Sequence, residues 1–114
     1  MGYVEAFEVV EAYVPEAIVV ASGAEIKQNG IYLLFDGAKP FSVVEDKVHF
    51  TIVVAANSYT RENGVMGVVD DLRKRSFAHA KIDWQEVKAL VFENAQLYFV
   101  ACNIRVEIDF REDM

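Results

Sequence analysis

Residues 103–110 read NIRVEIDF, and apolar and polar side chains alternate through the whole stretch. An alternation of period two places successive side chains on opposite faces of a β-strand. One face is then buried while the other meets water, which is typical of antiparallel sheets. Residues 47–52 alternate in the same way, but residues 53–56 are wholly apolar, so we expect that end of the strand to be covered on both faces.

Two stretches outside these strands have the spacing of amphipathic helices. Residues 3–14 place aromatic and aliphatic side chains on one stripe and glutamates on the other, with Val4 as a misfit among the glutamates. Pro15 ends this helix, because proline lacks a backbone N–H and disfavours helical geometry in the residue before it. Residues 65–72 provide the apolar stripe of the second helix.

The second helix has several local signals. Its N-cap is expected within residues 57–60, where asparagine, serine and threonine occur. Asp71 and Arg75 are spaced to form an ion pair in the favourable direction. Gly64 and Gly67 would each weaken a helix by about 1 kcal/mol relative to alanine. Their presence indicates either a later helix start or the close approach of another backbone.

Three further apolar runs complete the predicted sheet. We expect a short buried strand at residues 17–21, a strand at residues 31–35 that residues 36–37 terminate, and a strand at residues 86–93 followed by a tight turn. This order of elements predicts an α+β fold, with a mostly antiparallel sheet and both helices packed on one face. The second helix could also cross over between strands, which leaves a mixed sheet open.

The composition indicates one globular domain spanning residues 1–114. Hydrophobic residues make up 54% of the chain, and the formal net charge is -7. An acidic chain is not attracted to phosphate backbones or anionic lipid, so we expect no specific nucleic-acid partner and no membrane. No apolar run approaches the ~20 residues that a membrane-spanning helix needs, and no secretory signal is visible. We therefore expect a cytoplasmic location, with Cys102 reduced.

The residues that could support catalysis or metal binding have simpler interpretations. His49 lies on the polar side of a predicted strand and His79 lies in a loop, and neither has a second ligand at metal spacing. Cys102 stands in an apolar strand, as a small buried hydrophobe does, and the sequence nominates no base to activate it. The adjacent Asp70 and Asp71 point in different directions on a helix. We therefore expect no catalytic residue, no cofactor and no metal ion.

Five residues are candidates for a protein–protein interface. Trp84, Phe92 and Tyr98 do not fit the predicted core stripes. Misfit aromatic side chains are typical of interfaces, where tyrosine and tryptophan are enriched, but they could equally cover a sheet face beneath a loop. Arg105 and Glu107 lie on the polar face of the last strand, where they could form ion pairs across a subunit boundary or simply face water.

The predicted strands and the second helix follow one another along the chain in a specific order. A strand at residues 31–35 is followed by a loop with Pro40, a strand that ends in VVAANS (residues 53–58), a helix with GVVDDLR (residues 67–73) and a closing pair of strands. In this arrangement the chain resembles the small tail-completion, or tail terminator, proteins of tailed phages and Mu-like prophages. The helix at the N-terminus fits the same plan.

The resemblance implies a structural protein without an active site. Tail terminators form a ring, commonly of six subunits, which caps the tail tube and offers a surface to the head. The implied partners are copies of the chain itself, the tail tube and the head-completion proteins. The implied locations are the host cytoplasm during assembly and then the virion tail. Two other classes stay open, namely a small-molecule-binding or enzymatic α+β domain with a pocket, and a dimeric adaptor.

Overall fold

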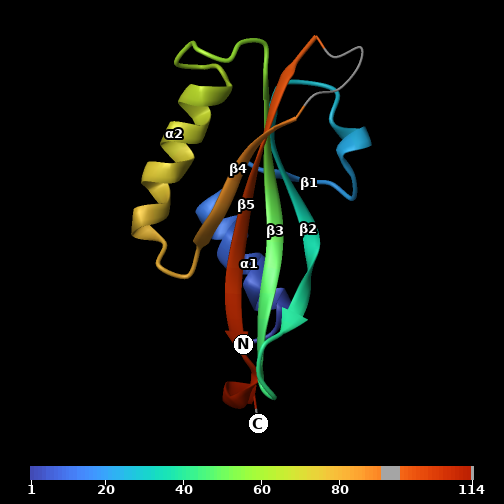
Figure 1. Cartoon of the computed structure of the whole chain (residues 1–114), viewed down its shortest axis with the longest axis vertical. Coiled ribbons are helices and arrows are strands. Elements are labelled where there is room, and N and C mark those ends of the chain that lie inside the picture. Colours follow the sequence, from blue (N-terminus) through green and yellow to red (C-terminus); the bar gives the residue numbers. More distant parts are fainter. Residues whose placement is uncertain (91–95, 114) are drawn as a thin grey trace.

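The structure of this chain is a computed structural model that describes residues 1–90 and 96–113. Its helices and strands are α1 (Tyr3–Tyr13), β1 (Ile18–Val19), β2 (Gly30–Pro40), β3 (Glu45–Ala56), α2 (Val65–Arg75), β4 (Asp83–Leu90) and β5 (Tyr98–Asp109). Three short 3₁₀ helices, η1 (Gly23–Glu25), η2 (Ser76–Ala78) and η3 (Phe110–Asp113), lie between or after them. Figure 1 shows the long strands β2, β3 and β5 running together along the longest axis of the molecule.

The strands form one five-stranded sheet in the order β1-β2-β3-β5-β4. The short β1 is parallel to β2, whereas the pairs β2–β3, β3–β5 and β5–β4 are all antiparallel. The mostly antiparallel α+β fold expected from the sequence is confirmed, and the sheet is mixed. The chain passes through α2 between β3 and β4, which flank β5 and run in the same direction. The second helix is therefore a crossover.

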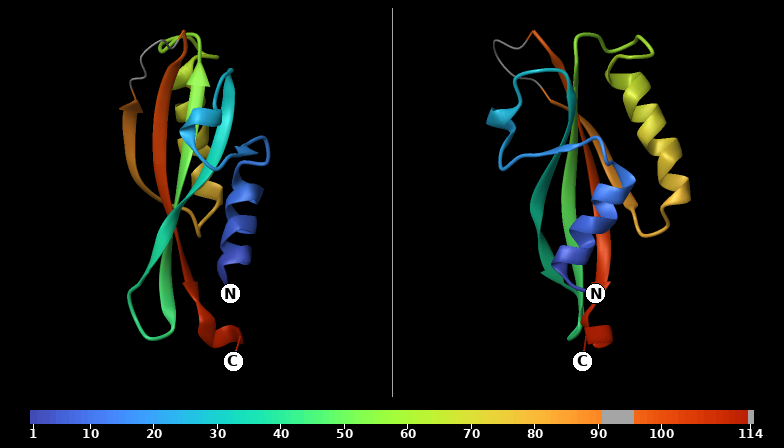
Figure 2. Two further views of the ribbon diagram at one scale, coloured as in Figure 1. Left: turned by 90° about the vertical axis from the view of Figure 1, so that its right-hand side faces the viewer. Right: turned by 180° about the vertical axis from the view of Figure 1, so that it is seen from behind.

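Both helices pack on one face of the sheet, and in Figure 2 α2 lies behind the strands in the left view while α1 lies in front of them in the right view. The alternating residues of β3 and β5 that point to this face are buried, and they include Phe50, Ile52 and Ile104. On the helix side they meet Val10 of α1 and Leu72 of α2. Burying a large apolar side chain contributes about 1.5–3 kcal/mol, so this face is the main source of stability.

Tyr13 joins three elements at the centre of this core. Its buried hydroxyl donates a hydrogen bond to the backbone carbonyl of Leu72, with an O–O distance of 2.5 Å. The same hydroxyl accepts a hydrogen bond from the Trp84 indole, with an N–O distance of 3.1 Å. Burial raises the pKa of Tyr13, so the phenol stays protonated and able to donate. One side chain of α1 therefore connects α2 and β4.

On the opposite face of the sheet, the described residues form a second apolar cluster at one end. Ile26, in the segment between η1 and β2, packs with Tyr32, Val53, Ala55 and Phe99 in a second, smaller apolar cluster. This cluster covers the stretch of β3 where the alternation is lost. The expectation that this end of β3 is covered on both faces is therefore confirmed.

Three predicted strand boundaries differ from the structure. The run at residues 17–21 forms only the two-residue β1, and both of its residues are exposed rather than buried. β2 does not end at residues 36–37 but continues to Pro40, because a bulge between Phe35 and Gly37 takes up the irregularity. Gly37 has a φ of 123°, which favours glycine. β4 begins at Asp83 rather than Glu86, and most of the turn predicted after it lies outside the described residues.

The N-cap expected for α2 within residues 57–60 is wrong, since the helix begins at Val65 with Gly64 as its N-cap. A backbone contact sets this later start, because Ser58 and Tyr59 accept hydrogen bonds from the first helical N–H groups. The same loop presses on the helix at Gly67, where an added Cβ would lie 2.0 Å from the Glu62 carbonyl oxygen. Both explanations offered for the glycines, a late start and a close backbone, are confirmed.

Ion pairs and a hydrogen bond of Arg75 connect the end of α2 with the end of α1 and the residues that follow it. Arg75 lies 2.7 Å from the carboxylate of Asp71 and 2.7 Å from that of Glu16, and it also donates to the Tyr13 carbonyl. The pair between Asp71 and Arg75 confirms the spacing seen in the sequence. The hydrogen bond from Arg75 is the main cause that lowers the pKa of Glu16.

Candidate functional site

The outer edge of β4 is the first exposed feature that could bind another chain. Every residue of Asp83–Leu90 is exposed or half-buried, and α2 packs on β3 and β5. Within residues 1–90 and 96–113, no strand pairs with the outer side of β4. An unpaired strand presents a row of backbone N–H and C=O groups that can template a further strand. We call this surface the β4 edge.

The second half of β2 provides another open edge on the opposite side of the sheet. β1 pairs with β2 only at Tyr32 and Leu33, and Val20 donates one further hydrogen bond to the Leu33 carbonyl. Beyond Leu33, no strand of the described chain lies outside β2. The open part therefore runs from Leu34 to Pro40, and we call it the β2 edge.

Along each edge an acidic side chain precedes a basic one, and because β4 runs opposite to β2 the two orders are opposed in space. On the sheet face away from the helices, the β4 edge presents Glu86 and then Lys88, because both are paired through β5 to residues of that face. The β2 edge presents Asp36 beside the bulge and then Lys39 on the same face. Charged side chains on an edge oppose pairing with an arbitrary strand, so these edges select among partners.

An apolar patch lies beside the β2 edge, where α1 meets β2. It consists of Tyr3, Val4, Phe7 and Phe35, which together with Glu8 and Glu11 line a shallow hollow of about 480 Å³. Val4 is 73% exposed and Phe35 is 51% exposed. Val4 is the residue that did not fit the predicted helix stripe, so its position at this patch explains the misfit. We call these four residues the α1–β2 patch.

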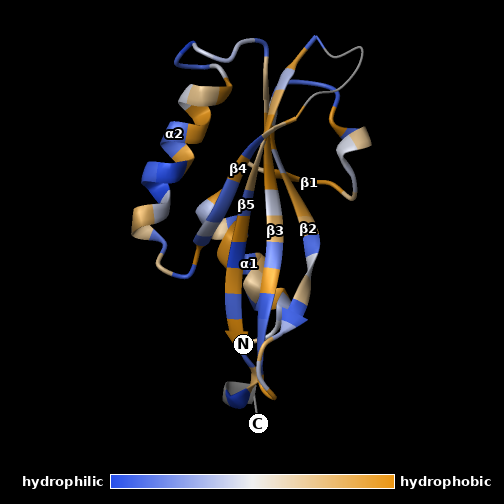
Figure 3. Ribbon diagram, viewed as in Figure 1, coloured by the Kyte–Doolittle hydropathy of each residue, from blue (hydrophilic) through white to orange (hydrophobic). Residues whose placement is uncertain are grey.

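The polar face of β5 brings two of the five predicted interface residues together. Arg105 lies 2.5 Å from the carboxylate of Asp83 on β4 and 3.8 Å from that of Glu107. The alternation that Figure 3 shows along β5 places these side chains on the face away from the helices. Because Arg105 forms an ion pair with Asp83 of the same chain, this pair connects β4 to β5.

The predicted aromatic residues do not form one cluster. Trp84 is half-buried on the helix face, where its indole donates to Tyr13 and lies under the guanidinium of Arg73. Tyr98 is exposed at the start of β5, and its ring lies 4.4 Å from that of Tyr59. Phe92 lies outside the described residues. Trp84 therefore works as a core residue at the base of the β4 edge.

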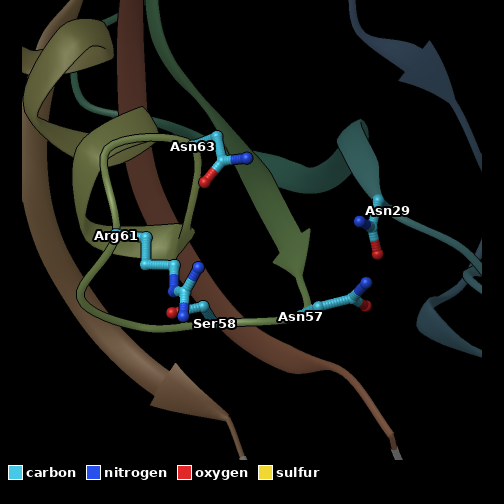
Figure 4. Close-up of a pocket in the computed structure, with 5 residues that line it drawn as sticks. All are labelled: Asn29, Asn57, Ser58, Arg61 and Asn63. Atoms are coloured by element: carbon cyan, nitrogen blue, oxygen red, sulfur yellow. The ribbon is translucent and has the colours of Figure 1, made fainter.

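A polar hollow lies at the end of the sheet near the start of α2. It has a volume of about 490 Å³ and is lined by Asn29, Asn57, Ser58, Arg61 and Asn63. Figure 4 shows these side chains coming from three places, namely the segment before β2, the end of β3 and the loop before α2. Amide and guanidinium groups can donate several hydrogen bonds to a small polar ligand.

The groups that could bind a metal ion or act as a nucleophile are dispersed or buried in the described part of the chain. No three His, Cys, Asp or Glu side chains in residues 1–90 and 96–111 lie close enough together to hold a metal ion. Cys102 is fully buried, and burial raises the pKa of its thiol to about 12. A thiol with so high a pKa is protonated near neutral pH and therefore a poor nucleophile.

The β2 edge and the α1–β2 patch are the exposed features that sequence reasoning missed. Two signals could have indicated the edge, because Lys39 and Pro40 are both typical of edge strands.

None of the described helices has the length and apolar character needed to span a bilayer. No model of a known protein family matches the chain, and no curated protein matches it either.

Proposed function

We propose that this chain is a structural assembly protein that acts as a phage or prophage tail-completion protein. In this role it forms an oligomeric ring, caps the tail tube and joins the tail to the head. The observation that carries the proposal is the pair of unlike open edges, the β4 edge and the β2 edge, on opposite sides of one sheet. The family resemblance of the sequence supplies the biological setting.

Two unlike surfaces are what a ring requires. In a cyclic ring each subunit offers one surface to the next copy and a different surface to the previous copy, and the contact repeats until rotation closes it. A dimer with two-fold symmetry would use one surface twice. A chain with two different edges of similar length is therefore suited to a head-to-tail ring.

Contact with other proteins of the tail needs further surface that the ring does not use. The hairpin between β2 and β3 projects at one end of the molecule, and its tip exposes Phe41 and Val43. Aromatic and aliphatic side chains at an exposed tip can anchor a contact by burial in a partner pocket. We assign this tip to the contact with the tail tube or the head.

The test of the proposed function is the mass of the particle in solution, measured by light scattering over a wide range of protein concentrations. We expect the 12.9 kDa chain to form a closed oligomer that negative-stain microscopy shows as a ring, either alone or at the ends of isolated tail tubes. A chain that stays monomeric at all concentrations and does not bind tube ends would contradict the proposal.

A second candidate function is the binding of a small polar ligand in the hollow lined by Arg61 and its asparagine neighbours. The volume of about 490 Å³ lies within the range of small-molecule sites. A ligand screen read by thermal shift tests this candidate. A ligand of this hollow should stabilise the natural chain and lose its effect in Arg61→Ala, while Arg111→Ala serves as the matched control at a distant position.

A further inference from the structure

We infer that the β4 edge of one copy pairs directly with the β2 edge of the next copy, so that the sheet continues from subunit to subunit. The inference rests on the proposed function, and it names the partner and the residues of the contact. The occupant of each edge is a second copy of this chain.

Strand direction favours this pairing. The strands β2, β3, β5 and β4 alternate in direction across the sheet, so β4 runs opposite to β2. When two copies stand side by side in the same orientation, the β4 edge of one copy meets the β2 edge of the next as an antiparallel pair. Subunits in a cyclic ring have this head-to-tail arrangement, and antiparallel pairing gives well-aligned hydrogen bonds.

Strand length agrees as well. The β4 edge extends over Asp83–Leu90, and the open part of β2 extends over residues 34–40. The two edges are therefore nearly equal in length. β1 stops at Val19, beside Leu33, and leaves this half of β2 accessible.

The pleat of the two strands restricts the pairing to registers that differ by two residues. Opposite residues of a strand pair must point to the same face. When Val87 stands opposite Ala38, both side chains lie on the helix face, because they are paired within the sheet to residues of that face. Their neighbours Glu86 and Lys39 then also stand opposite each other, on the other face.

Charge supports the same register. Glu86 meets Lys39, and Lys88 meets Gly37 with Asp36 in the bulge beside it. Two pairs of opposite charge form on one face, and a shift by two residues in one direction would place Glu86 near Asp36. Opposite charges stabilise a cross-strand pair, whereas like charges directly opposite destabilise it.

Apolar contact on the helix face adds to the pairing. Val87 is 49% exposed, and Phe35 of the α1–β2 patch is 51% exposed. In this register Val87 and Ala89 approach the β2 edge from the side on which Phe35 lies. The contact would remove the exposed side chains of Val87 and Phe35 from water.

A two-fold pairing of β4 with β4 is the alternative that must be distinguished. With Val87 on the two-fold axis, Glu86 of each copy would stand opposite Lys88 of the other. That arrangement also pairs opposite charges, but it makes a dimer and leaves the β2 edge open. The two arrangements differ in which residue stands opposite Val87.

Disulfide trapping tests this difference. In the double variant Val87→Cys/Ala38→Cys we expect oxidation to give a ladder of covalent oligomers on a denaturing gel. In Val87→Cys alone we expect no cross-linked species, because its neighbour in the ring is Ala38. All cysteine variants carry Cys102→Ala, because Cys102 stands opposite Val87 on β5 and would compete by forming a disulfide within the chain, and Cys102→Ala alone is the control. A covalent dimer from Val87→Cys alone would overturn the inference in favour of the two-fold pairing.

Charge reversal provides an independent test. We expect Glu86→Lys and Lys39→Glu each to raise the concentration needed for assembly at least tenfold, and the double variant to restore it. Asp70→Lys, an exposed change of equal charge on α2, should leave assembly unchanged, and circular dichroism checks that each variant folds. Restoration by Glu86→Lys/Lys88→Glu instead of by Glu86→Lys/Lys39→Glu would overturn the inference.

Assembly of the natural chain distinguishes a failure of the edge pairing from a failure of the proposed function. When the natural chain assembles but neither the charge variants nor the cysteine pair respond, the edge pairing is wrong and the proposed function stands. When the natural chain does not assemble under any condition, alone or with tail tubes, the proposed function fails together with the pairing.

Discussion

The two faces of the sheet differ in what lies on them, although the same strands build both. On the helix face, Phe50 and its neighbours are fully buried beneath α1 and α2. On the other face, Lys47, His49 and Thr51 remain partly exposed below the small cluster that covers Val53 and Ala55. The helix face therefore supplies most of the burial that stabilises the fold, and the other face is only partly covered.

The largest expected effect comes from opening a cavity on the helix face. Phe50→Ala removes a buried ring that packs edge-on against Phe7, with ring centroids 5.0 Å apart. We expect a loss of about 3–5 kcal/mol in the free energy of unfolding, because the transferred surface and the cavity both contribute. Urea unfolding measures it. His49→Ala, one residue away on the other face, should cost less than about 1 kcal/mol.

A smaller effect is expected where the loop before α2 presses on the helix. Gly67→Ala would place a Cβ 2.0 Å from the Glu62 carbonyl oxygen, so the loop or the helix must shift. We expect a loss of about 1–3 kcal/mol, which is typical of overpacking, although alanine has the higher helix propensity. A stability equal to or above that of the natural chain would contradict the close backbone contact.

The hydroxyl of Tyr13 gives a third test, because it is a polar group on the apolar face. Tyr13→Phe keeps the ring but leaves the Leu72 carbonyl and the Trp84 indole without this partner. We expect a loss of about 1–3 kcal/mol, the penalty of an unsatisfied buried group. Tyr59→Phe is the matched control, since its ring is only half-buried. Thermal unfolding of both variants, followed by circular dichroism, compares them.

The difference between the faces also decides what could be predicted from the sequence. The strict alternation in β3 and β5 predicted two strands and their buried face, since a side chain's face depends on local spacing alone. The start of α2 could not be predicted in this way. It depends on hydrogen bonds from Val65 and Met66 to residues of a loop that only the folded chain brings close.

The candidate site was predicted less well than the core. Trp84 was identified as a misfit aromatic, but the structure shows its indole bonded to Tyr13, a contact across 71 positions of sequence that local patterns do not encode. The β2 edge was missed because residues 36–37 resemble the end of a strand, whereas the glycine permits a bulge and the strand continues. Which edge of a sheet stays open depends on the order of the strands, and local spacing does not determine that order.

The smallest expected effect lies away from both faces, at the ion pair between Glu16 and Arg75. The pKa of Glu16 is lowered from its ordinary value of 4.5, mainly by the hydrogen bond from Arg75. When the pH is above this ordinary pKa, the ionised carboxylate therefore stabilises the folded chain. The contribution is lost as the pH falls through the lower pKa of the folded state. Because the side chain of Glu16 is 45% exposed, solvent screening limits the contribution to about 0.5 kcal/mol.

The pH dependence of unfolding tests this assignment. In Glu16→Gln we expect the free energy of unfolding to fall by that amount at pH 7 and to match the natural chain once the pH lies below the lowered pKa of the folded state, where both side chains are neutral. Glu8→Gln, an exposed change on α1 that removes the same charge, is the control. A difference that persists undiminished at low pH would show that Glu16 acts through packing and not through its charge. The connection between the two helices would then depend on Asp71 and the Tyr13 carbonyl as the partners of Arg75.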